Sequence, residues 1–128
     1  MSITPDQFLT FAESSLASSS AGEFEFRNAA SRAYYSAFHC CLAERQRCPN
    51  LKDSDIFGSH DRLYARYREL SNGDVENKLK SMAYMAQMMK SVRHEADYKL
   101  NLPFQKRDAD QQVSDAGKIL KSWKEINS

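Results

Sequence analysis

A long stretch without proline or glycine, from Arg27 to Arg47, constrains the fold of this chain more than any other feature. Alanine is frequent in it, and alanine is the strongest helix former. We therefore predict a helix from about Glu23 to Arg47, ended before Pro49, which cannot continue a helix. At about 100° per residue its apolar side chains gather on one face, typical of packing against a core. These side chains are Ala30, Ala33, Tyr34, Ala37, Phe38 and Cys41.

The opposite face of this predicted helix is polar. It carries Asn28, Arg32, Tyr35 and His39 at spacings that place them along one line of the helix. Such a face is either solvated, or a seam to a second copy of the chain, or a functional site. Periodicity alone leaves these alternatives open.

The remaining chain also has helical rather than strand periodicity, since no stretch alternates long enough for a strand. Thr4, Pro5 and Gln7 predict the start of a first helix, whose inward face has Phe8, Phe11, Ala12 and Leu16. Three further helices are predicted: a short one over His60 to Leu70 capped by Ser59, a long one capped by Asp74, and a last one opened by a capping box of Asp108 and Gln111. A loop is predicted from Lys52 to Gly58. The prediction is a single all-α domain over residues 1–128, an antiparallel bundle of four to five helices with two long central ones.

The second long helix carries another polar cluster. Its core stripe is continued by Arg93 and Asp97, which are spaced to pair with each other and lie either on a buried face or at its rim. His94 and Tyr98 lie on the flank beside this pair. The stripe itself consists of Val75, Leu79, Met82, Ala86 and Met89.

Composition limits the classes of protein. The chain has 128 residues, with 41% hydrophobic and 27% charged residues, which is typical of one globular domain. The net charge of +1 gives no overall attraction to nucleic acid, so such binding would need a local patch. We expect no membrane span, because no apolar run approaches about 18 residues. Three cysteines without a CxxC pattern and no signal-peptide start predict buried thiols and a cytoplasmic location.

Known metal and nucleotide motifs are absent from the sequence, so we expect no metal and no cofactor. Metal-free acid–base chemistry on a phosphate remains. Arg32 and His39, seven residues apart, share one helix face, where a guanidinium can hold a phosphate while an imidazole transfers a proton. These two groups are the minimum set for cleaving RNA through attack by its own 2′-hydroxyl. A solvated stripe or a dimer seam is the alternative for the same face.

Three blocks, SRAYYSAFHCC, GSH and RHEADY, resemble the HEPN superfamily over most of the chain, from Phe24 to about Trp123. The resemblance is closest to small stand-alone members that are often paired with minimal nucleotidyltransferases. It implies a helical bundle that dimerises along its long helices and acts as a metal-independent ribonuclease in toxin–antitoxin or defence systems. Two copies of an Arg followed four to six residues later by a His form one composite site in this superfamily.

Two positions of this chain fit that motif in part. Arg93 has the polar follower His94, but Tyr98 stands where the histidine is expected, and a tyrosine with a pKa of about 10 does not exchange a proton readily at neutral pH. Arg32 and His39 have the spacing, but Ala33 follows the arginine.

Two functions follow from this resemblance. The first is a homodimeric ribonuclease that acts on RNA; the second is a non-catalytic module that binds an antitoxin, a partner nucleotidyltransferase or a nucleotide. Candidate catalytic residues are Arg32, His39 and Arg93, and candidate RNA- or nucleotide-binding residues are Asn28, Tyr35, His94, Asp97 and Tyr98.

Overall fold

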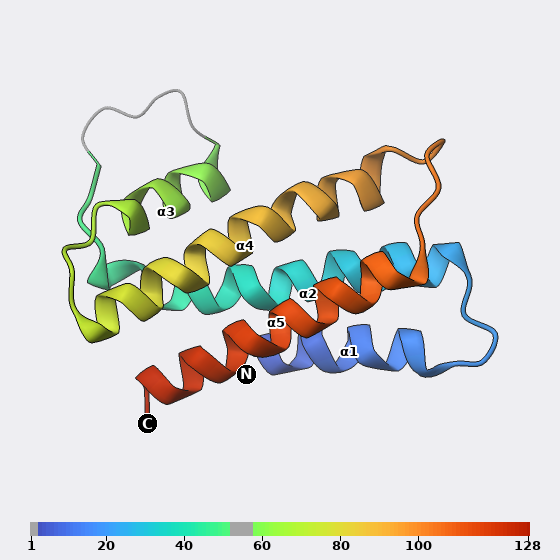
Figure 1. The fold of residues 1–128 in the computed structure, drawn as a ribbon, viewed down its shortest axis with the longest axis horizontal. Helices are drawn as coiled ribbons and strands as arrows, with labels where there is room; N and C mark the ends of the chain where they lie inside the picture. Colours follow the sequence, from blue (N-terminus) through green and yellow to red (C-terminus); the bar gives the residue numbers. More distant parts are fainter. Residues whose placement is uncertain (1–2, 52–57) are drawn as a thin grey trace.

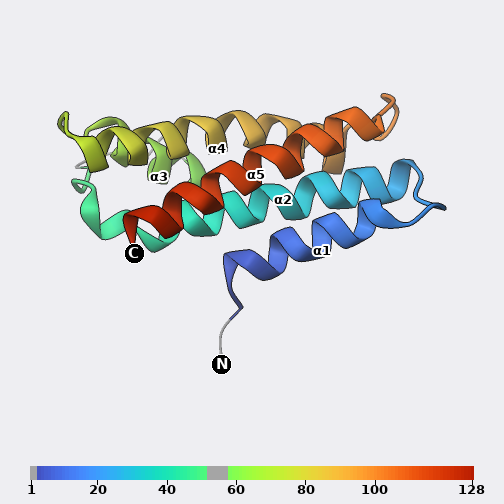
Figure 2. The same cartoon turned by 60° about the horizontal axis from the view of Figure 1, so that its bottom comes forward.

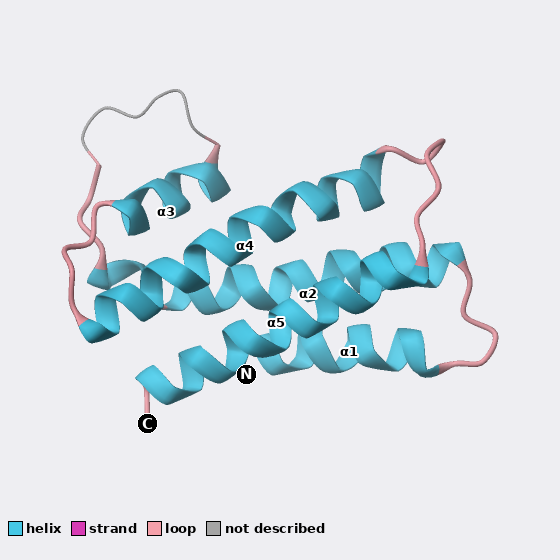
Figure 3. Ribbon diagram, viewed as in Figure 1, coloured by secondary structure: helices cyan, strands magenta, loops and turns pink. Residues whose placement is uncertain are grey.

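The computed structural model describes residues 3–51 and 58–128, and within them it contains helices and no strand (Figure 3). The predicted all-α fold is therefore confirmed. The helices are α1 (Pro5–Ala17), α2 (Glu23–Ala43), α3 (Ser59–Arg68), α4 (Asp74–Tyr98) and α5 (Lys106–Ile126), with a 3₁₀ turn at Arg45–Arg47.

Helix α2 lies at the centre of the bundle and contacts α1, α4 and α5 (Figure 1). The chain reverses direction from α1 to α2 and from α4 to α5 (Figure 1). The predicted antiparallel arrangement does not extend to α2 and α5, which lie side by side and run in the same direction, since Gln112 bonds Ala30 near their starts and Trp123 bonds Glu44 near their ends. The short α3 lies at one end beside α4 (Figures 1 and 2). Fully buried alanines of α2 allow its neighbours to approach closely; these are Ala29, Ala30, Ala33 and Ala37.

The helix starts follow local capping chemistry. The predicted start of α1 is confirmed, because Pro5 is its first residue and the Gln7 side chain accepts the N–H of Thr4 at 2.8 Å. Two predicted caps are wrong by one residue. Glycines occupy the positions before α3 and α4, so Ser59 and Asp74 are the first residues of these helices instead of their caps.

The C-terminal end of α2 and the start of α5 also differ from prediction, whereas α2 begins at Glu23 as predicted. The predicted box of Asp108 and Gln111 is wrong, because the Asp108 carboxylate accepts the N–H of Gln105 at 2.9 Å and α5 begins at Lys106. Helix α2 stops at Ala43, and the 3₁₀ turn covers the rest of the predicted span. The predicted loop from Lys52 to Gly58 falls almost entirely outside the described residues.

The predicted inward faces are correct except at two positions. Phe11 is 54% exposed, because α1 packs on the bundle through the face that carries Leu9 and Ala12. Val75 is 39% exposed, because the first turn of α4 extends beyond the core. No helix in the described ranges combines the length and the hydrophobicity needed to cross a bilayer.

The three cysteines have free thiols buried in the core, as predicted. Burial raises the pKa of Cys40 to about 12. Because only the thiolate reacts readily, this thiol is unsuited to nucleophilic chemistry at neutral pH.

Candidate functional site

Arg93 joins α4 to the polar face of α2. Its guanidinium carbon lies 5.5 Å from the ring centre of Tyr34 and 5.8 Å from that of Tyr35, within the range of cation–π attraction. Its Nη1 lies 3.4 Å from a carboxylate oxygen of Asp97, which also accepts the hydroxyl proton of Ser31 at 3.2 Å. The Arg93 side chain is 12% exposed and that of Asp97 is 31% exposed, so the pair lies at the rim of the buried stripe of α4.

These neighbours keep the Arg93 guanidinium protonated. Burial acts to lower the pKa of Arg93, but Tyr35, Asp97 and Tyr98 outweigh it, and the pKa is raised above its usual value. Its Nε atom is buried and has no hydrogen-bond partner among the described residues. Arg93 is therefore a largely buried cation beside the site, held by Asp97 and the tyrosine rings.

Arg32 is the more available cation. Its guanidinium carbon lies 5.0 Å from the ring centre of Tyr35, so Tyr35 contacts both arginines. Neither an ion pair nor a hydrogen bond to the Arg32 side chain occurs within residues 3–51 and 58–128. An arginine that keeps its donors free in this way can bind a phosphate without first breaking an internal bond.

A row of aromatic rings connects Arg32 to His39. The Tyr35 ring centre lies 6.3 Å from that of Phe8, and Phe8 stacks on the His39 imidazole at 5.1 Å. Phe38 meets His39 edge-on at 5.3 Å. Burial among these rings lowers the pKa of His39. At neutral pH the imidazole is therefore uncharged and can accept a proton.

His60 of α3 is a member of this cluster that we did not predict. Its Nδ1 lies 2.6 Å from the Tyr34 hydroxyl, which also lies 2.8 Å from the Tyr64 hydroxyl. The imidazole stacks on Phe38 at 4.0 Å. Burial lowers the pKa of His60, and the positive charges of Arg93 and Lys90 lower it further.

The sequence contained one signal for His60, since GSH is a block of the resemblance described above. Tyr34 was predicted only as a core residue. It is buried, and burial raises its pKa, so its hydroxyl keeps its proton and can bridge His60 and Tyr64.

The other predicted residues lie at or beyond the edge of the cluster. Tyr98 is exposed, and its ring centre lies 5.9 Å from the Arg93 guanidinium carbon. His94 is exposed and stacks on Tyr98 at 4.9 Å, while Asn28 is exposed on the first turns of α2. The structure thus brings together Arg32, Tyr35, Arg93 and Asp97, connects His39 through Phe8, and leaves Asn28 and His94 outside.

We call the set formed by Arg32, Tyr34, Tyr35, His39, His60, Arg93 and Asp97 the candidate site. It offers a free cation, a fixed cation, two neutral imidazoles and half-buried ring faces. This combination suits a phosphate ester attached to flat rings. No protein-family model matches the chain, and neither the curated proteins nor the solved structures include one with significant similarity to it.

Proposed function

We propose that this chain is a HEPN-like protein of the toxin or defence type that acts on RNA as a metal-independent endoribonuclease, with two copies completing its site. One observation carries the proposal. Arg32, without a counter-ion among the described residues, and His39, with a lowered pKa, lie at the two ends of one row of aromatic rings.

The row of rings supports RNA as the substrate. Single-stranded RNA is recognised by stacking of its bases on aromatic side chains, combined with cations that hold the backbone. Tyr35 and Phe8 are half-buried, so part of each ring is open to solvent. The net charge of +1 means that attraction to the phosphates is local, from Arg32 above all.

The chemistry follows from the same residues. Arg32 holds the non-bridging oxygens of the phosphate, and the neutral His39 removes the proton of the 2′-hydroxyl. The 2′-oxygen attacks phosphorus, and the bond from phosphorus to the 5′-oxygen breaks. Water gives that oxygen its proton, and the proton on His39 passes to solvent. The products are a 2′,3′-cyclic phosphate and a 5′-hydroxyl. Arg93 positions Tyr35 in this scheme, since its own bonds are committed to Asp97.

The test is cleavage of single-stranded RNA by the purified protein in EDTA. Arg32→Ala and His39→Ala should each lower the rate by about a hundredfold or more, because each removes a group that acts in the transition state. Lys118→Ala, on an exposed part of α5, is the matched control and should cleave at the unchanged rate. Cleavage that survives both site changes would exclude this site.

A specific observation also favours the second candidate function, a non-catalytic module. Arg93 pairs within its own chain with Asp97 and lies over the rings of Tyr34 and Tyr35, as in a structural network. Such a module would bind an antitoxin or a nucleotidyltransferase instead of cutting RNA. It predicts no cleavage by the purified protein and a stable complex with the protein encoded by the neighbouring gene, detected by co-purification.

A further inference from the structure

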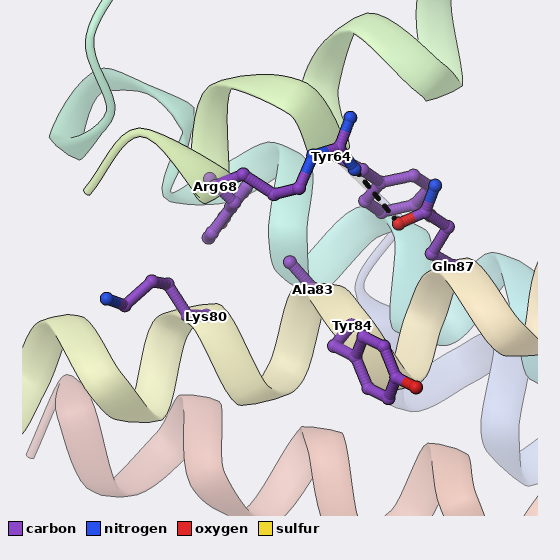
Figure 4. A pocket seen from close by; sticks show the side chains of 7 residues that line it. Tyr64, Arg68, Lys80, Ala83, Tyr84 and Gln87 are labelled. Atoms are coloured by element: carbon purple, nitrogen blue, oxygen red, sulfur yellow. Dashed lines mark hydrogen bonds between the residues drawn. The ribbon is translucent and has the colours of Figure 1, made fainter.

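A concave site lies between α3 and α4, apart from the row of rings. It is a pocket of about 350 Å³, within the size range of small-molecule sites (Figure 4). We propose that this pocket binds a small aromatic anion, a flat ring that carries a phosphate or a carboxylate. The proposal stands on the pocket alone and does not require the chain to act on RNA.

The walls of the pocket suit a flat ring. Tyr84 of α4 follows Ala83, whose small side chain leaves room for a ring, while Tyr64 of α3 lines the pocket from the core side and is itself buried (Figure 4). Tyr84 is 68% exposed, so its ring is accessible to a ligand. Aromatic faces attract other rings in offset or edge-on arrangements, which a flat ligand can adopt here.

The charge of the pocket suits an anion. Arg68 of α3 donates a hydrogen bond to the amide oxygen of Gln87 at 3.2 Å, across the gap between the two helices. Lys80 donates to the carbonyl of Leu70 at 3.3 Å and to the side-chain oxygen of Asn72 at 3.1 Å. All of these acceptors are neutral. Within the described ranges, no carboxylate pairs with either cation, so two positive charges line one small pocket without a counter-ion.

An anionic group is therefore a better partner for these side chains than their present ones. A hydrogen bond between charged groups is roughly twice as strong as one to a neutral amide. Arg68 can exchange the Gln87 oxygen for a phosphate or carboxylate oxygen, which frees the Gln87 amide to bond the ligand as well. A neutral ring would use the aromatic walls only, and a free inorganic anion would use the cations only.

Isothermal titration calorimetry with a matched series of probes tests the proposal. We expect 1-naphthyl phosphate and 1-naphthoate to bind, and we expect 1-naphthol and inorganic phosphate to bind at least about tenfold more weakly, because each lacks one half of the interaction. The tighter of the two anionic probes identifies the kind of anion. Failure of both anions to bind at millimolar concentration, or equal binding of 1-naphthol, would overturn the proposal.

Substitutions of the lining residues test whether the probe binds in this pocket. Arg68→Gln and Lys80→Gln should each weaken binding of 1-naphthyl phosphate about tenfold or more, and Tyr84→Ala should weaken it as well. Lys118→Gln should leave it unchanged.

Amide chemical shifts provide a second measurement on the wild-type protein. Addition of 1-naphthyl phosphate should move the signals of Ala83 and Gln87 while those of α1 stay in place. Unchanged signals at Ala83 and Gln87, or unweakened binding by all three pocket variants, would place the ligand elsewhere and refute the assignment.

Discussion

The last turn of α4 presents backbone carbonyls that a helix cannot satisfy by itself, and Arg27 of α2 binds them. Its Nη1 donates to the carbonyls of Glu95 at 3.1 Å and Ala96 at 3.0 Å. Its Nη2 donates to Lys99 at 3.3 Å and also to Leu102. One buried guanidinium therefore closes the end of a helix that lies far away in sequence. The two arginines on α2 thus have opposite roles, since Arg32 has no hydrogen bond or ion pair among the described residues.

Replacing Arg27 tests this role. Arg27→Met keeps much of the apolar stem but leaves the carbonyls of α4 and the Glu23 carboxylate, which lies 3.1 Å from Nε, without their donor. We expect the free energy of unfolding to fall by about 3 kcal/mol, the usual cost of leaving buried polar groups unpaired. Arg32→Met on the same helix should cost about 1 kcal/mol or less. Urea denaturation measures both, and equal losses would contradict the assignment.

The pKa of His39 depends on the aromatic ring that shields its imidazole from water. The Phe8 ring stacks on the imidazole, and burial lowers the pKa of His39. Phe8→Ala should therefore raise this pKa toward about 6.5, its value in an unstructured chain. Nuclear magnetic resonance titration of the imidazole signals measures the shift. Phe11→Ala removes an exposed ring from the same helix and should leave the pKa of His39 where it is.

The same shift has a consequence for stability. A histidine with a lowered pKa binds fewer protons in the folded than in the unfolded chain, so its contribution is lost as the pH falls from about 6.5. Phe8→Ala should reduce the part of the acid-induced loss of stability that comes from His39. If the mutant loses as much stability from this group between pH 7 and pH 5 as the wild type does, burial by Phe8 is not the cause.

At the scale of elements, α3 is attached to the bundle by a few specific bonds. Its His60 and Tyr64 both meet the hydroxyl of Tyr34 of α2, and its Asp61 pairs with Lys90 of α4 at 2.8 Å. This short helix is therefore the element whose docking depends most on single side chains.

Removing the Tyr34 hydroxyl should loosen α3 selectively. Tyr34→Phe leaves the Tyr64 hydroxyl and the His60 Nδ1 without their shared partner, and we expect a loss of about 2 kcal/mol of unfolding free energy. Amide hydrogen exchange should become faster in α3 and stay unchanged in α1. Tyr98→Phe, on an exposed ring, is the control.

The double variant Tyr34→Phe with Tyr64→Phe removes two hydroxyls of this network. The double variant should lose less unfolding free energy than the two single variants lose together, because neither hydroxyl is then left without its partner. Strict additivity would show that the two hydroxyls do not act as a pair.

These elements also show what the sequence can and cannot predict. Helix type and the inward faces follow from local periodicity, which is why α2 and α4 were predicted closely. The role of His60 depends on where α3 docks, and this is determined by contacts with Tyr34, far away in the chain. Arg27 was missed for the same reason, since its acceptors lie on α4 and in the loop after it. Phe11 was assigned inward because periodicity does not determine how far a helix is turned.

At the scale of the whole molecule, four helices contribute to the candidate site and its cover: α1 through Phe8, α2 through Arg32 and His39, α3 through His60 and α4 through Arg93. The site therefore exists only in the folded bundle. One copy supplies a single cation without a counter-ion among the described residues, and we propose that a second copy adds its own Arg32 and His39 to the same site.

A mixed dimer tests whether two copies of the chain share one site. The Arg32→Ala and His39→Ala chains, each inactive in the proposed mechanism, can be co-expressed with different affinity tags and purified in tandem as one complex. If two copies share one site, this complex has one intact Arg32 and one intact His39 within it, and it should cleave RNA in EDTA well above either parent.

A complex of Arg32→Ala with the double variant Arg32→Ala, His39→Ala has no intact Arg32 and should stay inactive. Light scattering must show that both complexes contain two chains. A mixed dimer of the correct mass that cleaves no better than its parents would show that each copy works alone or that the site does not cut.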